Sequence, residues 1–375
     1  MPDDADSCTL ADGIGARGGI PSEFLNVDLL MRATVVPANE LPEDLIARWA
    51  NIQERNSTLF SPFFRPEFTR SVAKVRDDVF VAILDGGAAF FPFQRNALGQ
   101  GKPVGGPVSD YHGLIAEPDY DCDAPALMRA CKLRAWSFDH VPAPQTMFAP
   151  WRLIDTESPV VDLTQSEAPG STALYADHRR KRRRLEREVG EVEVELQSTD
   201  PAMLDFCLKW KSAHYHRIGT PDLFERPWAR ALMDVIASER KPEFAGMLSV
   251  MRAGGQPIAA HFGLRSGNVW HYWFPTYDPQ FQRHSPGILL LLEMMAGAPK
   301  IGINLIDFGR GDNDYKLRIS NRRVPLIEGT AVANPMIWRC KSGLRQFVRG
   351  APIIKSMLMP AHRLYQEFNR RARLR

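Results

Sequence analysis

The spacing of apolar and polar residues predicts two similar pairs of β-strands in this chain. In each pair, two short apolar runs are joined by a turn that contains Gly-Gly, which is typical of a strand hairpin. The runs are Val79–Leu84 with Ala88–Gln94, and Met247–Arg252 with Ile258–Arg265. The Gly-Gly that begins at 254 follows the one that begins at 86 by 168 residues, which indicates an internal repeat.

Two further pairs of segments share this spacing. The helix-like segment APALMRACKLRAW, which begins at Ala124, corresponds to the apolar run at 288–295, and Trp136–Asp139 corresponds to Asn304–Asp307. A duplicated unit would explain all of these matches, and the alternative is chance similarity between common elements. If the unit is duplicated, each half is a mixed sheet flanked by helices, and the polar stretch Leu163–Ser171 links the halves.

Composition indicates an ordinary soluble protein that is long enough for two hydrophobic cores. Of its 375 residues, 44% are hydrophobic and 24% are charged. The five cysteines are scattered and form no Cys-x-x-Cys pair, which predicts neither a disulfide framework nor a zinc site and favours a cytoplasmic location. Residues 1–27 lack the apolar segment of a signal sequence, and we expect them to be disordered.

The charge is unevenly distributed, since the C-terminal tail is strongly basic. Residues 339–375 contain ten Lys or Arg and one Glu, so this segment carries +9 and the rest of the chain −6 of the total of +3. Apolar residues recur every three or four positions from Ile353 to Phe368, which predicts a basic amphipathic helix. Residues 331–375 therefore form a tail that would lie on an anionic membrane surface, or would pack its apolar face on the protein itself.

A strand, a glycine-containing loop, a helix and a second strand follow one another between Val269 and Lys316. The strand reads VWHYWFP, the helical run ILLLLEMMAGA, and the second strand NLIDF with glycines after it. Backbone N–H groups at a helix start favour phosphate groups, because the helix dipole is positive there. The loop Arg283–Gly287 therefore either binds an anionic ligand or is simply a capped helix start.

Residues 172–330 resemble the acyltransferases of the GNAT superfamily that are described as cellulose-biosynthesis (CelD-like) acetyltransferases. The matching stretches are HRRKRRRLEREVG, GGQPIAAHFGLR, VWHYWFPTYDP, RHSPGILLLLEMM and IDFGRGDNDYK. This group is related to Fem-type aminoacyltransferases, which carry two GNAT-like lobes. The resemblance implies acetyl-CoA, or another acyl-CoA, as donor and no metal. It also implies that Tyr272, Trp273 and Phe274 pair with the donor through their backbone, and that Arg283, His284, Ser285 and Gly287 surround its phosphates.

Three residues are candidates for the chemistry of acyl transfer. His261 alternates with the small Ala259 and Gly263, which would leave room for a ligand beside an imidazole that can act as a base. Asp307 ends a strand, where ligand crevices of α/β folds lie. The resemblance suggests that Lys316 faces the donor or its acyl carbonyl. The alternatives are a structural histidine, a turn cap or ion pair, and a solvated lysine.

An acceptor site is predicted around the segment KWKSAHYHRIGTPDLF. Trp210 and His214 share a helix face, and Tyr215 and Asp222 follow, so these four residues would form one wall of the site, although a core helix is the alternative. The basic run Arg179–Arg184 suggests nucleic acid or a phosphate-bearing substrate, but its apolar spacing favours a solvated amphipathic helix. We therefore expect no nucleic-acid partner.

The sequence thus predicts an α/β (α+β) protein with two tandem GNAT-like lobes, at 28–165 and 172–330. Its expected activity is acyl-CoA-dependent transfer, in the first instance of acetyl, to a hydroxyl or amine of a polysaccharide or its precursor. The alternatives are a Fem-type transferase that uses charged tRNA and a non-enzymatic adaptor of a polysaccharide synthase complex. The expected location is the cytoplasm, with contact to the inner membrane face through the tail.

Overall fold

One mixed β-sheet runs through the part of the chain that the structure, a computed structural model, describes, which is residues 31–165, 172–311 and 314–336. The elements below belong to the unit that begins at Arg32. The strand order is β1-β2-β3-β4-β6-β14-β7-β13-β12-β11-β10-β8, with β5 beside β3 and β9 beside β10. The strands are β1 Ala33–Pro37, β2 Val79–Leu84, β3 Ala89–Arg95, β4 Gln100–Lys102, β5 Ile115–Ala116, β6 Ala135–Pro142, β7 Arg152–Asp162, β8 Val192–Glu195, β9 Arg240–Lys241, β10 Phe244–Ala253, β11 Gln256–Ser266, β12 Val269–Tyr277, β13 Leu305–Asp307 and β14 Arg322–Val332.

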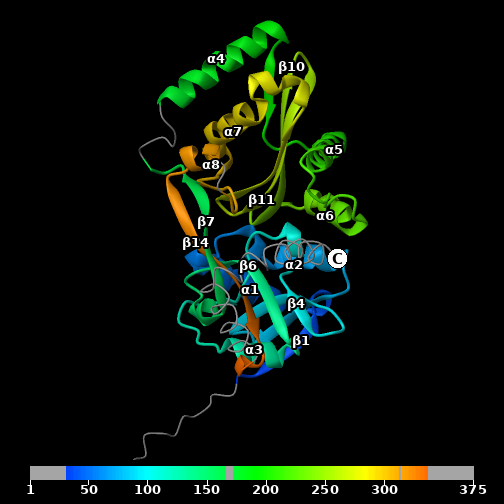
Figure 1. Cartoon of the computed structure of the whole chain (residues 1–375), viewed down its shortest axis with the longest axis vertical. Coiled ribbons are helices and arrows are strands. Elements are labelled where there is room, and N and C mark those ends of the chain that lie inside the picture. Colours follow the sequence, from blue (N-terminus) through cyan, green and yellow to red (C-terminus); the bar gives the residue numbers. More distant parts are fainter. Residues whose placement is uncertain (1–30, 166–171, 312–313, 337–375) are drawn as a thin grey trace, which may run out of the picture. The chain divides into compact units, whose positions relative to one another are not determined.

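Helices cover this sheet in both halves of the chain (Figure 1). They are α1 Glu43–Arg55, α2 Pro66–Ala73, α3 Ala124–Ala130, α4 Thr172–Glu188, α5 Pro201–Arg217, α6 Pro227–Ser238, α7 Pro286–Gly297 and α8 Asp314–Ile319. Short 3-10 turns, among them η4 Pro62–Phe64 and η7 Pro279–His284, connect them. The prediction of two lobes, each a mixed sheet with flanking helices, is confirmed.

Both predicted hairpins are present, as β2 with β3 and β10 with β11, each paired antiparallel. Between Met251 and Arg252 the second hairpin contains a register shift. The helix predicted from Ala124 is shorter than its sequence pattern, since it ends at Ala130 and strand β6 begins at Ala135. Lys132 has a φ of 54°, a left-handed conformation that does not continue a helix, so the chain turns there.

Strand β7 joins the two lobes because it pairs with different strands along its length. Its residues 152–160 pair with β14, and Val160–Asp162 pair with β13. Strand β14 begins within the range predicted for the C-terminal lobe, yet it lies between β6 and β7. The sheet is therefore continuous from one lobe to the other, and the last described strand returns to the N-terminal half.

The C-terminal lobe has three layers, with α7 on one face of the sheet and α5 and α6 on the other (Figure 1). Helix α7 buries its leucines and methionines against β10, β11 and β12, and α5 packs on β11 and β12. Strands covered on both faces read as continuous apolar runs, which explains why β12 carries Trp270, Tyr272, Trp273 and Phe274 together. Polar side chains inside this strand therefore require partners.

Several sequence predictions fall outside the described residues. These are the N-terminal segment up to residue 30, the linker at 166–171 and the tail from residue 337 onward. The predicted amphipathic helix of the tail therefore stays a prediction. Among the helices that the structure describes, none is long and apolar enough to cross a membrane.

Candidate active site

Strands β12 and β13 diverge in the C-terminal lobe, and the divergence opens one edge of β12. The two strands pair in parallel over three residues, of which the last pair is His271 with Asp307. Strand β12 continues to Tyr277 but there pairs with β11 alone. Among the described residues, no strand therefore covers the other edge of β12 beyond His271, so backbone groups on this edge can bind a ligand.

A β-bulge marks the point of divergence. The register between β11 and β12 shifts between Phe262 and Leu264, so that Gly263 faces an extra residue of β12. Bulges bend a strand and are frequent next to active sites. Packing requires glycine here, because a Cβ on Gly263 would lie 2.5 Å from both His261 Cε1 and the His271 carbonyl oxygen.

His271 lies at the apex of this divergence, between two carboxylates. Its Nε2 is 2.8 Å from Oδ2 of Asp110, and its Nδ1 is 3.6 Å from Oδ2 of Asp307. Burial alone would lower the pKa of His271, but the two carboxylates raise it to about 9. His271 is therefore an imidazolium at neutral pH, and it holds together Asp110 from the N-terminal lobe and Asp307 from the C-terminal lobe.

Of the three groups, the carboxylate of Asp110 is the accessible one. The side chains of His271 and Asp307 are fully buried, whereas that of Asp110 is 28% exposed. Burial raises the pKa of Asp110, but its hydrogen bond and attraction to His271 outweigh this effect and lower the pKa below its ordinary value. An ionised carboxylate thus reaches the surface of the site, with a fixed cation behind it.

Asp307 is held from two further sides. Its Oδ1 accepts hydrogen bonds from the Ser158 hydroxyl and from the backbone N–H of Gly309, the latter at 2.9 Å. These two hydrogen bonds, together with His271, keep Asp307 ionised despite its burial. Burial and the Asp307 carboxylate in turn raise the pKa of the Tyr111 phenol well above its ordinary value.

Gly309 is required by the same arrangement. Its φ is +65°, and a Cβ there would lie 2.6 Å from Asp110 Oδ2 and 3.2 Å from His271 Cε1. Only glycine therefore lets the turn after β13 approach the Asp110–His271 pair.

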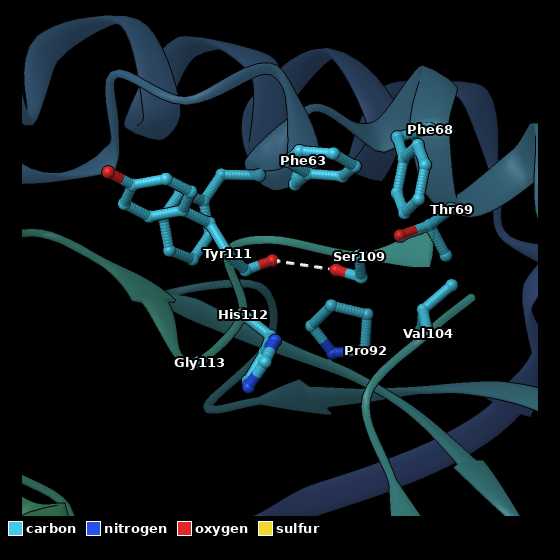
Figure 2. A pocket seen from close by; sticks show the side chains of 10 residues that line it. Phe63, Phe68, Thr69, Pro92, Val104, Ser109, Tyr111, His112 and Gly113 are labelled. Carbon is cyan, nitrogen blue, oxygen red and sulfur yellow. Dashed lines mark hydrogen bonds between the residues drawn. The ribbon is translucent and has the colours of Figure 1, made fainter. Parts of the chain in front are cut away.

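A small cavity of about 10 Å³ lies beside the loop that carries Asp110 and has room for about one water molecule. Figure 2 shows this cavity among Phe63, Phe68 and Pro92, with Ser109 donating a hydrogen bond to the Tyr111 carbonyl.

The structure places His261 behind the bulge and away from solvent. Its Nε2 accepts a hydrogen bond from the backbone N–H of Trp273 at 3.2 Å, and its ring stacks on Tyr272. Burial, and then the positive charges of His271 and Lys211, lower the pKa of His261 well below its ordinary value. The space expected beside Gly263 is filled by protein atoms. These contacts give His261 a structural role, and its catalytic role stays a prediction.

Lys316 lies on α8 near the two carboxylates. Its Nζ donates to the Phe308 carbonyl at 2.8 Å, and among the described residues no carboxylate lies within ion-pair distance. Burial lowers the pKa of Lys316, although Asp110 and Asp307 attract its positive charge. The structure thus brings Lys316 and Asp307 together, as a shared site requires, and it adds His271 and Asp110.

The predicted donor loop lies at the start of α7. Ser285 has a φ of 54° and does not cap the helix, and its Oγ accepts from Lys181 Nζ at 3.1 Å. Arg283 pairs with Glu188 at 2.8 Å and donates from Nε to His284, which is buried. A Cβ on Gly287 would meet only Tyr277, at an ordinary 3.5 Å, so packing does not require glycine at this position.

The predicted backbone contacts of the donor fall on the open stretch of β12. The side chains of Tyr272, Trp273 and Phe274 are buried, so a ligand could meet these residues through their backbone only. Two of their backbone groups already have partners, since the Trp273 N–H donates to His261 Nε2 and the Phe274 carbonyl accepts from Cys207 Sγ. Donor binding through this backbone stays a prediction. The Trp273 indole donates to the Val108 carbonyl at 3.0 Å, which ties β12 to the N-terminal lobe.

The four predicted acceptor residues lie in and after α5, but they make different contacts. Trp210 packs on Phe206, and His214 Nδ1 lies 2.8 Å from Arg217. Tyr215 packs on Phe224, and burial raises its pKa to about 12. Asp222 is buried, and it accepts from Ser212 and from the backbone N–H of Phe224, so it stabilises the turn after the helix. A role in acceptor binding stays a prediction for all four.

Sequence reasoning missed His271, Asp110, Tyr111 and Ser158. His271 is the polar residue inside the apolar strand VWHYWFP, where it should have required a charged or polar partner. The partner, Asp110, lies in SDYHG, a polar group within a Gly- and Pro-rich stretch 161 residues earlier. Nothing in the sequence alone places these two segments side by side.

Comparisons with known proteins give a match for part of the chain. Residues 174–317 match the acetyltransferase (GNAT) domain family. The enzyme class of the protein is therefore acyltransferase. None of the curated proteins compared with the chain matches it.

Solved structures show the same fold across most of the chain. The C-terminal domain of a putative lysylphosphatidylglycerol synthetase from Agrobacterium fabrum has a TM-score of 0.52 at 15% identity, covering 78% of this chain and 92% of that one. FemX has a TM-score of 0.51 at 10% identity and covers 82% of this chain and 99% of that one. A tandem GNAT protein from the clavulanic acid biosynthesis pathway has a TM-score of 0.47 at 10% identity, with 81% and 99% covered.

Proposed function

We propose that the protein transfers an acyl group, in the first instance acetyl, from acyl-CoA to a hydroxyl or amine. The observation that carries this proposal is the divergence of β12 from β13 directly after His271 and Asp307, with the ionised Asp110 at its apex. An open strand edge beside a fixed carboxylate supplies both a donor site and a group that can orient the acceptor.

The donor would lie along the open edge of β12, from Tyr272 toward the start of α7. Three features fit its phosphates: the uncapped helix start, the Lys181 ammonium beside Ser285, and the free space at Gly287. The amide groups of the donor would pair with the β12 backbone. The thioester would then lie near the bulge, close to the His271 apex.

Asp110 would accept a hydrogen bond from the acceptor and receive its proton as the new bond to the acyl carbon forms. The C–S bond of the thioester then breaks, and coenzyme A leaves as a thiol with the proton that Asp110 received. The low pKa of Asp110 makes it a weak base, so its main contribution is orientation of the nucleophile, with proton transfer completed as the acceptor becomes acidic in the transition state. The His271 imidazolium and Asp307 hold Asp110 in place. Lys316 would stabilise negative charge on the acyl oxygen, since no carboxylate among the described residues occupies its ammonium.

The acceptor proposed from the sequence resemblance to CelD-like acetyltransferases is a polysaccharide or its precursor. Such an acceptor agrees with aromatic and polar groups on α5, among them Trp210 and Tyr215, which suit a sugar face and its hydroxyls. We place the enzyme in the cytoplasm, at the inner membrane face, on the basis of its cysteine usage and basic tail.

Aminoacyl transfer from charged tRNA is the second candidate. It is favoured by the fold shared with FemX, which extends over both lobes, and by Arg179, Arg183 and Arg187 on the exposed side of α4. No carboxylate of the described chain pairs with these three arginines, which are spaced four residues apart.

Isothermal titration calorimetry with acetyl-CoA, and separately with a charged-tRNA analogue, tests the two activities. We expect saturable binding of acetyl-CoA by the wild type and at least tenfold weaker binding by Gly287→Val. The control Ala202→Val, at an exposed residue in the first turn of α5, should bind like the wild type. Binding of the tRNA analogue with no binding of acetyl-CoA would overturn the proposal in favour of the second candidate.

A further inference from the structure

A second lysine, Lys211, lies half-buried beside the open stretch of β12. It belongs to α5, and its Nζ donates to the Pro275 carbonyl of β12 at 3.3 Å. The ammonium also lies over the ring of Tyr215, 5.4 Å from its centroid. Among the described residues, no carboxylate lies within ion-pair distance of this ammonium, so its charge is not neutralised by the protein.

An unpaired charge in such a position is costly. An ammonium has three N–H donors, and a charge removed from water is destabilising unless it is paired and hydrogen-bonded. One of the three donors is used by Pro275. Burial, with a contribution from the nearby Lys316 ammonium, lowers the pKa of Lys211 to about 8. The Lys211 ammonium thus lies beside the proposed donor edge without a carboxylate partner among the described residues.

Another lysine of the same helix shows that α5 does not bury every lysine side chain that it carries. Lys209, two residues away, is exposed to solvent, whereas Lys211 points toward β12. Packing of the aliphatic stem and the contact with Tyr215 explain where the side chain lies, but they do not neutralise its charge. A ligand with negative charge would neutralise Lys211 through charge-assisted hydrogen bonds to the two remaining donors.

We propose that Lys211 binds an anionic group, a phosphate or a carboxylate, of the acyl acceptor. This inference rests on the proposed function, because it takes the open edge of β12 as the donor site and the space beyond it as the acceptor site. The acceptor is then an acidic molecule, such as a phosphorylated or uronic sugar, and not a neutral one. In this arrangement Lys316 stabilises the acyl oxygen, and Asp110 orients the nucleophile of the acceptor.

Carbon-13 NMR of the full-length protein with carbon-13-labelled, chemically unmodified lysines tests this binding site directly, because all three N–H donors of each ammonium are kept. The Lys211 signal is assigned by its loss in Lys211→Arg, and the protein is titrated at pH 7 with inorganic phosphate, acetate and glucose, with and without coenzyme A. We expect the Lys211 signal to shift saturably with phosphate or acetate and to stay in place with glucose. The pKa of Lys211 should rise in the bound state, because the anion binds the charged form.

The Lys209 signal is the internal control. The proposal is overturned if the Lys211 signal stays in place with both anions, moves in parallel with that of Lys209, or responds equally to glucose. A larger response to phosphate points to a phosphate-bearing acceptor, and a larger response to acetate points to a carboxylate. If Lys211 binds the anion while calorimetry finds no binding of acetyl-CoA, the donor assignment fails and the anion site stands.

Discussion

The stability of this protein should depend on pH through one buried group, His271. In the folded protein its pKa is about 9, because the Asp110 and Asp307 carboxylates more than offset its burial. In the unfolded chain the pKa is about 6.5. Each pKa unit corresponds to about 1.36 kcal/mol, so the charged histidine contributes about 3 kcal/mol to the free energy of unfolding.

The sign of the effect follows from the raised pKa. Below pH 6.5 both states are protonated and the contribution is fully present. As the pH rises, the unfolded chain loses its proton first, so folded protein is progressively less favoured, and the contribution is lost as the pH passes 9. Between pH 6 and pH 9.5 the wild type should therefore lose about 3 kcal/mol that His271→Gln does not lose.

Urea unfolding followed by tryptophan fluorescence at pH 6 and pH 9.5 measures this difference. Other groups that titrate in the range, such as Lys211, are present in both proteins and cancel in the comparison. His216→Gln, at an exposed histidine of α5, is the control and should follow the wild type. Parallel pH dependences for wild type and His271→Gln, with equal urea slopes, would refute the assignment of His271 as a buried imidazolium.

Three other predictions concern donor binding, catalysis and the tail. Asp110→Asn should lower acetyl transfer by about 10² or more while leaving acetyl-CoA affinity within twofold, as measured by turnover and calorimetry; an unchanged rate would remove Asp110 from the mechanism. Alanine variants of Asp307 and Lys316 should lose turnover, whereas the main effect of His261→Ala should be a lower unfolding temperature. Wild-type turnover in all three variants would place the chemistry elsewhere. Truncation after Pro352 should abolish salt-sensitive binding to anionic vesicles in co-sedimentation, each removed Lys or Arg being worth roughly 1 kcal/mol near the surface; equal binding of both forms would exclude the tail as an anchor.

The local architecture was predictable because its signals are local. Alternating apolar runs and Gly-Gly turns identify β2–β3 and β10–β11, and the apolar run that begins with Pro-Gly identifies α7. The same holds for Asp307, since a strand end with glycines after it is readable in sequence. The helix predicted from Ala124 is too long, because Lys132 takes a left-handed conformation that a lysine does not signal in the sequence.

The composition of the site was not predictable, because its partners are distant in sequence. His261 and His271 are both single histidines in apolar strands, and alternation alone cannot distinguish them. The difference lies in what the other lobe supplies: Asp110 reaches His271, whereas His261 meets backbone and aromatic rings. Pairing across 161 residues depends on tertiary packing and not on propensity.

The domain match covers residues 174–317, yet the site extends beyond its N-terminal end. His271, Asp307 and Lys316 lie inside the match, whereas Asp110 and Ser158, which hold His271 and Asp307, lie before it. Strand β7, which also precedes the match, covers the free edge of β13. Without these parts, the imidazole would lose its closest carboxylate and Asp307 would lose a hydrogen bond while remaining buried, which is costly for a charged group. We therefore expect activity to require both lobes, because the N-terminal lobe supplies the partners of His271 and Asp307.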